Sequence, residues 1–261
     1  MRPLVVIADG NAASLNIKSA LLGLEKFEQK QERFWSAADF DMAEYEGSIV
    51  EIVPAHDAEC YIFASTHRSA SNARSLTVHT PGNWGSADLG GEPRTLDFAC
   101  PGRLKAAAQK MQELSPQLPG WQVSVEVDHH GPSLARPVMF AEIGSTQAEW
   151  ENPVAGKIAA QAIAAAARSG KDFPAYVGFG GTHYAPKFTP RIMGSDIAFG
   201  HLISGYALER SPPDEEMVRQ ALERNEGKIE GAMLDWKGIK RGSKDALVKI
   251  LDSLGAKWEK A

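Results

Sequence analysis

Short runs of apolar residues alternate with longer segments of helical periodicity along most of the chain. Continuous apolar runs are typical of strands that are buried on both faces. They occur at residues 4–8, 61–64 and 176–179, and at 138–143, where only Glu142 breaks the run. Residues 121–127 instead alternate between apolar and polar positions, with Glu126 on the polar side, which predicts a half-buried strand. Further strands are expected at 49–53, 76–78 and 229–235, and a strand or a short helix at 197–203.

The segments between these runs have the composition and periodicity of helices. We expect helices at residues 13–24, 103–114, 147–168, 211–225 and 243–255. Ser243 is expected to cap the last of them. The repeated alternation of strand and helix predicts an α/β fold with a mixed, largely parallel central sheet flanked by helices. Residues 1–261 are expected to form one domain. A sub-domain boundary, if there is one, is expected in the polar, patternless segment 37–47.

Composition narrows the class of protein. Hydrophobic residues make up 43% of the 261 residues and charged residues 23%, which excludes a disordered chain. Two cysteines, Cys60 and Cys100, are too few for disulfide bonds to stabilise a chain of this size. Their apolar surroundings predict buried thiols in a reducing cytoplasm. The net charge of −5 provides no overall positive field for nucleic acid. No apolar stretch is long enough to cross a membrane or to form the core of a signal peptide.

Polar residues collect where five of the expected strands end. The segments that follow these strands begin with Ser65-Thr66-His67, His79-Thr80-Pro81, Asp128-His129-His130, Gly180-Gly181-Thr182-His183 and Asp235-Trp236-Lys237. In open α/β sheets, ligands bind beside the carboxyl ends of the strands. The five segments therefore predict one functional cleft.

Histidine is the residue type that marks this cleft. Six of the seven histidines lie between residues 67 and 201, whereas His56 stands alone and is expected to be a turn residue. A zinc site assembled from members of this group is chemically reasonable because imidazole suits Zn²⁺, although no named metal motif is present. The candidates for such a site are His67, His79, His129, His183 and His201. On a strand, adjacent side chains point to opposite faces, so only one of His129 and His130 is expected to face the cleft.

A carboxylate and two glycine-containing turns add to the candidates. Glu142 interrupts an apolar strand, so it either pairs with Arg136 or a histidine, or serves as a general base or metal ligand. The segments 82–83 and 180–182 match no phosphate-binding fingerprint. They are either tight turns or places where backbone N–H groups approach a ligand or an oxyanion.

A local cluster of cations follows the Asp235-Trp236 strand end, with five Lys and Arg residues between 237 and 249. One interpretation is a solvated start of the last helix. The other is a phosphate contact at the rim of the cleft, with Trp84 or Trp236 as a stacking surface for a base.

Six motifs occur in order across residues 76–238: LTVHTPGNWG, DHHGP, MFAEIGSTQAEW, GFGGTHYAPKF, AFGHL and LDWKG. Together they resemble the archaeal-type D-aminoacyl-tRNA deacylases, the second class of that activity. The opening segment IADGNAASLNI is also similar to the family's first strand and helix, so the resemblance spans nearly the whole chain. Two positions differ from the family pattern. The stretch around His67 reads STHRSAS rather than an Arg-His-Ser-Ser run, and Asp128 stands where the family has threonine.

The resemblance implies a fold akin to those of phosphorylase and peptidyl-tRNA hydrolase, zinc as the cofactor, and hydrolysis of the ester that joins a D-amino acid to the 3′ end of tRNA. It implies a monomer that acts on aminoacyl-tRNA, with His130, Glu142 and His183 as catalytic residues. The metal or orienting residues would be His67, His79 and His129. Substrate-binding residues would be Gly82, Asn83, Trp84, Gly180, Gly181, Thr182, Asp235 and Lys237.

Two other functions remain open from the sequence. One is a metal-dependent amidohydrolase or nucleoside-processing enzyme that acts on a free small molecule. The other is a protein that binds the 3′ end of tRNA without catalysis.

Overall fold

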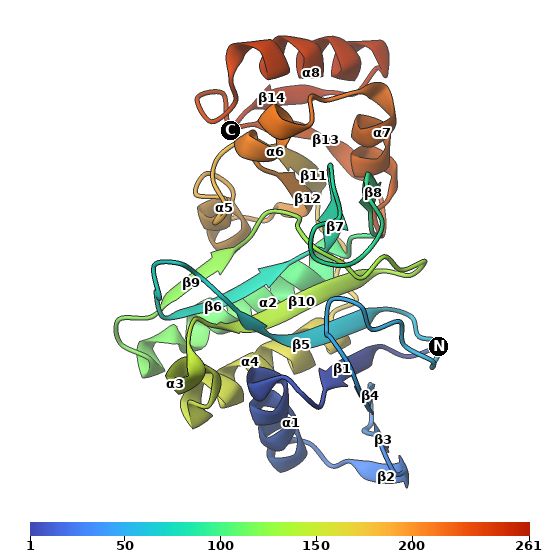
Figure 1. Cartoon of the computed structure of the whole chain (residues 1–261), viewed down its shortest axis with the longest axis vertical. Coiled ribbons are helices and arrows are strands. Elements are labelled where there is room, and N and C mark those ends of the chain that lie inside the picture. The colour runs from blue at the N-terminus through green and yellow to red at the C-terminus, as the bar shows by residue number, and fades with distance from the viewer.

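The computed structural model describes residues 1–261, and its strands form two main sheets (Figure 1). The large sheet has eight strands in the order β2-β3-β4-β1-β5-β10-β6-β9. Their bounds are β1 Leu4–Ala8, β2 Glu28–Gln31, β3 Phe34–Ser36, β4 Asp41–Tyr45, β5 Tyr61–His67, β6 Ser75–His79, β9 Gln122–Val125 and β10 Val138–Gly144. β1 pairs in parallel with β4 and β5, β5 with β10 and β6 with β9, whereas β10 and β6 are antiparallel.

The small sheet has four strands in the order β12-β11-β13-β14, and all of its neighbours are parallel. Its strands are β11 Ala175–Phe179, β12 Ala198–Ile203, β13 Ile229–Leu234 and β14 Trp258–Lys260. A short pair, β7 Gly82–Asn83 and β8 Thr95–Leu96, lies beside it in Figure 1. The predicted α/β class with largely parallel pairing is confirmed, and the strands are divided between two sheets rather than gathered in a single central one.

Helices flank both sheets. They are α1 Ala12–Leu24, α2 Pro101–Leu114, α3 Gln147–Trp150, α4 Pro153–Arg168, α5 Thr189–Gly194, α6 Gly205–Arg210, α7 Glu215–Glu223 and α8 Arg241–Ser253, with a 3-10 turn at Ser115–Gln117. The single helix predicted over 147–168 is divided into α3 and α4. The break occurs because Pro153 has no N–H to continue the first helix, and Asn152 caps the second by accepting from the N–H groups of Val154 and Ala155.

Three segments differ from the prediction. Residues 49–51 form a turn and residues 52–53 have no regular structure, so no strand forms there, and Val53 is 70% exposed. The segment 37–47, expected to be patternless, contains β4, which pairs with β1 along its whole length. The last helix begins at Arg241, so Ser243 lies inside it and donates its hydroxyl to the carbonyl of Leu208 instead of capping the helix.

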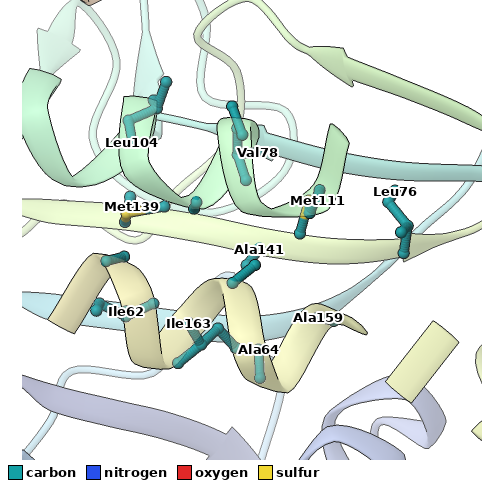
Figure 2. Packing of buried hydrophobic residues seen from close by; sticks show 14 of the residues in the cluster. Ile62, Ala64, Leu76, Val78, Leu104, Met111, Met139, Ala141, Ala159 and Ile163 are labelled. Atoms are coloured by element: carbon teal, nitrogen blue, oxygen red, sulfur yellow. The ribbon is translucent and has the colours of Figure 1, made fainter. Parts of the chain in front are cut away.

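The two faces of the large sheet have different surroundings. On one face, Ile62, Val78, Met139 and their neighbours pack against α2 and α4, as Figure 2 shows, and α1 extends this layer. On the other face, Phe63 and Phe140 stack with their ring centroids 4.7 Å apart. Side chains two positions apart on a strand share a face, so this second face also receives the polar residues that β5, β6, β9 and β10 carry toward the small sheet.

The junction between the two sheets is held by buried polar groups. Lys105 on α2 donates to the carbonyls of Ile192 and Ser195, both at 2.6 Å, and of Ile197 at 2.9 Å. These carbonyls belong to α5 and the approach to β12, so one ammonium group ties α2 to the small sheet. None of the helices has the length and apolar character required to span a bilayer.

Candidate active site

Seven side chains converge where the second face of the large sheet meets the carboxyl ends of the small sheet. We call them the histidine cluster; they are His67, His79, Glu126, His129, His130, Glu142 and His183. Strand alternation places the first part of the set: His67 ends β5, His79 ends β6 and Glu142 lies within β10, all on the face opposite the helices. The loops after β9 and β11 supply the rest.

Glu126 stands at the centre of the cluster and its side chain is fully buried. Its Oε2 lies 2.9 Å from His183 Nε2 and 3.5 Å from His129 Nε2, and its Oε1 lies 3.1 Å from His67 Nδ1. These distances are short enough for hydrogen bonds, yet neither oxygen has a partner in hydrogen-bonding alignment. The nitrogens and oxygens are therefore directed toward common points rather than toward one another.

His79 is the most enclosed of the five histidines. Its ring centroid lies 4.3 Å from that of His129, 4.9 Å from that of His130 and 5.1 Å from that of Phe140. Neither of its ring nitrogens has a hydrogen-bond partner. Buried polar atoms are nearly always paired in proteins, so the two nitrogens of His79 indicate that a group belongs between these side chains.

The backbone holds His129 and His130 in one tautomer. Nδ1 of His129 lies 2.8 Å from the carbonyl of Val127, and Nδ1 of His130 lies 2.6 Å from that of Gly131. A carbonyl only accepts, so each Nδ1 carries the hydrogen and each Nε2 keeps its lone pair. Both rings belong to the cluster, so the prediction that only one faces the cleft is wrong. The reason is that β9 ends before them and His130 has a left-handed φ of 48°.

Two phenols contact the remaining histidines. Tyr184 Oη lies 3.0 Å from His67 Nε2, and Tyr206 Oη lies 3.2 Å from His183 Nδ1. In each case the phenol is on the ring nitrogen that points away from Glu126, so it orients the ring with respect to the cluster. The sequence did not identify either tyrosine. Tyr184 directly follows His183 in the GGTHYAP motif, which was a usable signal, whereas nothing near Tyr206 marked it.

The electrostatics of the cluster favour a bound cation. Burial lowers the pKa of His130 to about 3 and that of His79 well below its ordinary value, so both rings are neutral. Burial opposes ionisation of Glu126, but the rings of His183, His129 and His67 outweigh it and hold its pKa below the usual range. Burial and the charge of Glu126 raise the pKa of Glu142. Burial disfavours the charged form of His67 as well, but Glu142 and Glu126 outweigh it and raise its pKa to about 10. The two carboxylates therefore attract positive charge into the cluster, and the neutral rings of His79 and His130 offer lone pairs beside them.

Three groups of side chains could hold a metal ion, each with its ligand atoms within 4.8 Å of one another. They are His79-His129-His130, His67-Glu126-His183 and His79-Glu126-Glu142. Tetrahedral ligands at about 2.0–2.1 Å from one ion lie about 3.4 Å apart, close to the separations measured around Glu126. The unpaired atoms of His79 and Glu126 and the mixed nitrogen and oxygen donors thus fit a divalent transition metal.

The structure corrects the prediction for Glu126 and selects between the partners expected for Glu142. Glu126 was assigned to the polar side of a half-buried strand, but it is buried and central to the cluster. Glu142 does not pair with Arg136, which instead contacts Asp57 at 3.3 Å. The Oε2 of Glu142 lies 3.5 Å from His67 Nδ1, so a histidine is its neighbour.

His201 lies outside the cluster, although the sequence placed it among the zinc candidates. Its Nδ1 lies 2.5 Å from Asp128 Oδ2, and its Nε2 lies 2.8 Å from the carbonyl of Arg224. Asp128 also accepts the N–H of Leu202 at 2.8 Å. This buried pair joins the loop after β9 to β12, so His201 positions the segment that carries His129 and His130 instead of binding metal itself.

The N–H groups of the two glycine-containing turns are used in backbone hydrogen bonds. Gly82 donates to the carbonyl of His130 at 2.9 Å, Gly180 to that of Ile203 at 2.7 Å, and Gly181 to that of Gly238 at 3.2 Å. These three N–H groups already have carbonyl partners, so the expectation that they receive an oxyanion is not supported. Gly180 has a φ of 103°, and a Cβ there would meet Ile239 and Asp235.

A cavity of about 230 Å³ opens beside His129 and His130. Gly82, Asn83, Trp84, Tyr206 and Arg210 also line it. Asn83 is held by donating its amide to the carbonyls of Gly90 and Glu92, and Trp84 by donating to that of Ser211. The predicted residues 82–84 therefore form a wall of the cavity next to the cluster.

The other predicted binding residues lie along the carboxyl edge of the small sheet. Thr182 is exposed in the loop between Gly181 and His183. Asp235 is buried and accepts the N–H of Gly238 at 3.1 Å, which makes it a turn residue. Lys237 is exposed in that turn.

A sequence profile of D-aminoacyl-tRNA deacylases matches residues 54–259. The match covers most of the chain and every member of the histidine cluster. The chain belongs to the D-aminoacyl-tRNA deacylase family.

Relatives of this family agree with the profile. The D-aminoacyl-tRNA deacylase of Pyrococcus furiosus is 39% identical over 203 residues, which cover 77% of this chain and 73% of the relative. That of Methanosarcina acetivorans is 36% identical over 274 aligned positions, which cover 97% of this chain and 90% of the relative. The crystal structure of a conserved protein of unknown function superposes with a TM-score of 0.91 at 31% identity, over 99% of this chain and 95% of the other.

The part of the chain outside the deacylase profile forms one side of the large sheet. Residues 1–53 contribute α1 and strands β1 to β4, and none of the cluster side chains comes from them. Asn11 reaches toward the site by donating its amide to Thr66 Oγ1 at 3.1 Å, one residue before His67. This first segment of the family member therefore supports the edge of the site without supplying its chemistry.

Proposed function

We propose that this chain hydrolyses the ester bond between a D-amino acid and tRNA, the activity for which its family is named. The observation that carries the proposal is the convergence of five histidines and two carboxylates from five strands and the loops that follow them, all within the residues that match the family. Hydrolysis of an ester requires an activated water molecule as the nucleophile, stabilisation of the oxyanion and a proton for the leaving oxygen.

We further propose that zinc is the metal held by the histidine cluster. His67, Glu126 and His183 would hold one ion, and His79, His129 and His130 present a second set of donors. The lone pairs on Nε2 of His129 and His130, fixed by backbone carbonyls, support this assignment. When bound, zinc supplies positive charge that polarises the ester carbonyl and makes water more acidic. His130 and His183 would thus act through the metal rather than as free bases.

Glu142 is our candidate for the proton acceptor. It is fixed within β10, lies beside His67 and adjoins Glu126 and His79, so its carboxylate faces the centre of the cluster. It would take the proton of the attacking water and return it to the leaving ribose oxygen. Nothing else in the cluster combines an oxygen base with a rigid strand position.

The 3′ end of tRNA is the part of the substrate that we expect at the site. The cavity beside His129 and His130 is lined by Trp84, Tyr206 and Arg210, which suit a nucleoside or an amino-acid side chain. Aminoacyl-tRNA is used where translation occurs, and the free buried thiols of Cys60 and Cys100 are suited to a reducing compartment. We therefore propose a cytoplasmic enzyme that acts as a monomer, which sedimentation of the metal-loaded protein would test.

The decisive assay compares D-tyrosyl-tRNA with L-tyrosyl-tRNA, with and without a chelator. Release of the amino acid from the D form alone is the expected result, together with loss of activity on chelation and recovery on addition of zinc. Binding of tRNA without release would indicate a non-catalytic tRNA binder. Turnover of free amides or nucleosides with no action on charged tRNA would instead favour a small-molecule hydrolase.

A further inference from the structure

The strands of the small sheet end side by side along one edge, and the histidine cluster lies at that edge. Parallel strands end at the same edge of a sheet, and the order β12-β11-β13-β14 determines what lies side by side there. β12 leads into α6, β11 into His183 and β13 into Lys237, and Lys260 of β14 pairs in register with Leu234 of β13. With strands about 4.8 Å apart, β14 lies about 10 Å from β11.

This edge is rich in cations. We call six of its side chains the basic edge; they are Arg210, Lys237, Lys240, Arg241, Lys244 and Lys260. The whole chain carries a net charge of −5, yet residues 236–261 contain seven Lys and Arg against three Asp and Glu. Positive charge is therefore concentrated in one place on an acidic protein.

The cations of the basic edge are poorly neutralised. Lys237, Lys244 and Lys260 have no carboxylate within 4.0 Å, and Arg241 is 93% exposed at 3.7 Å from its single acidic neighbour. Only Lys240 has a close partner, Glu209 at 2.7 Å. Elsewhere, by contrast, arginines such as Arg168 and Arg219 each contact two acidic residues. An unpaired group of this kind retains its attraction for an anionic partner.

Trp236 is the aromatic centre of the basic edge. The ammonium groups of Lys244 and Lys260 lie 4.6 Å and 4.3 Å from its ring centroid, and its ring stacks on Trp258 at 6.0 Å with an interplanar angle of 5°. Lys244 also donates to the carbonyl of Trp236 at 2.9 Å. These contacts fix the two ammonium groups near each other instead of leaving them on freely moving side chains.

Backbone contacts connect the basic edge to the active site. Gly181 donates its N–H to the carbonyl of Gly238 at 3.2 Å and accepts that of Gly205 at 2.9 Å. His183 follows two residues after Gly181, and Tyr206, next to Gly205, lies 3.2 Å from His183 Nδ1. A strand of nucleic acid whose 3′ residue lies at the cluster would thus reach the basic edge within a few nucleotides.

We propose that the basic edge binds the phosphate backbone of the tRNA acceptor end, upstream of the aminoacylated 3′ residue. The proposal rests on the proposed function, because it requires a tRNA substrate at the histidine cluster. Phosphate contacts position a nucleic acid without reading its sequence. Their loss weakens substrate and transition state equally, so the basic edge determines KM and leaves kcat unchanged.

The test combines the substitutions Arg241→Ala and Lys260→Ala in one variant. A control with the same change in charge combines Lys26→Ala and Lys157→Ala, two exposed lysines on the large-sheet side of the molecule. Deacylation of D-tyrosyl-tRNA is measured as a function of salt, and D-tyrosyl-adenosine serves as a second substrate that lacks the phosphodiester chain. The first variant should show a KM for tRNA raised about tenfold and a salt slope lowered by about 0.7–0.9 for each lost contact. Its rate on D-tyrosyl-adenosine should equal that of the unsubstituted protein.

An unchanged KM and salt slope for tRNA would overturn the proposal, as would an equal loss in the control variant. An equal loss on D-tyrosyl-adenosine would place the two residues in the active site instead of on a docking surface. If the unsubstituted protein does not cleave D-tyrosyl-tRNA, the proposed function fails separately. Filter binding of uncharged tRNA by the same variants then decides the role of the basic edge.

Discussion

His183 Nε2 lies 2.9 Å from Glu126 Oε2, yet the two atoms are not aligned for a hydrogen bond. The two residues lie 57 positions apart in the sequence, one after a strand of the large sheet and the other after a strand of the small one. Their closest atoms point toward a shared position, and His67 and His129 approach the same carboxylate. The junction of the two sheets is therefore also where the candidate metal ligands meet.

Replacing Glu126 with Gln should release the ion that we propose between His67, Glu126 and His183. The amide keeps the size of the side chain but removes the charge and one lone-pair oxygen, so we expect the zinc content to fall by the share of that ion and deacylation to fall about 100-fold or more. Metal content by mass spectrometry and kcat on D-tyrosyl-tRNA check this. Glu113→Gln on the exposed face of α2 is the control. Full zinc content in the Glu126 variant would contradict the central role of this carboxylate.

Replacing Tyr206 with Phe should weaken metal binding without unfolding the protein. The substitution removes only the hydroxyl that lies 3.2 Å from His183 Nδ1, and loss of such an orienting contact costs about 10–100-fold in metal affinity. Competition with a chromogenic chelator measures the affinity directly. Tyr184→Phe should behave alike, whereas Tyr45→Phe, whose hydroxyl contacts His56 away from the cluster, should not change it. Equal zinc affinity in all three variants would remove the tyrosines from the site.

Replacing Lys105 with Met should destabilise the junction between the sheets. The substitution leaves three carbonyls without their donor in a place where Lys105 is 1% exposed. We expect the free energy of unfolding to fall by about 2–4 kcal/mol. Lys110→Met, on the same helix but partly exposed and paired only with Glu113 at its surface, should change it by less than about 1 kcal/mol. Urea unfolding of the metal-free proteins compares the two, and similar losses would show that the buried ammonium has no special role.

Asp97 should make the protein less stable as the pH rises. Burial raises the pKa of Asp97 to about 7 in the folded protein from an ordinary value of 3.8, against the N–H of Leu134, which favours ionisation. The folded state therefore binds more protons than the unfolded state between about pH 4 and 7, and the free energy of unfolding falls across that range. A difference of this size corresponds to a cost on the order of 2–4 kcal/mol above pH 7.

Asp97→Asn removes this titration while keeping an oxygen for the N–H of Leu134. Urea unfolding of both metal-free proteins at pH 5 and pH 8 should show a smaller decrease for the variant. An identical decrease in the two proteins would mean that Asp97 titrates in its ordinary range.

The sequence determined most of the secondary structure where local chemistry decides it. The apolar runs at β1, β5 and β10 and the helices α1 and α2 were predicted within a few residues, since burial on both faces and helical periodicity leave a direct record in residue type. The predicted strand at 49–53 failed because its apolar residues find no neighbouring strand, whereas β4 forms because it pairs with β1. Strand formation depends on a partner that the local sequence does not contain.

For the site, the sequence by itself determined which segments carry the chemistry, because histidine and glycine beside strand ends are visible in the order of residues. Only the tertiary structure decided which of these side chains meet. It brought both His129 and His130 into the cluster through the left-handed backbone at His130, and it directed His201 to Asp128 instead. It also placed Glu126 at the centre. A buried carboxylate at the end of a short strand has the same sequence pattern as an exposed one, and only the packing of the small sheet against the large one distinguishes them.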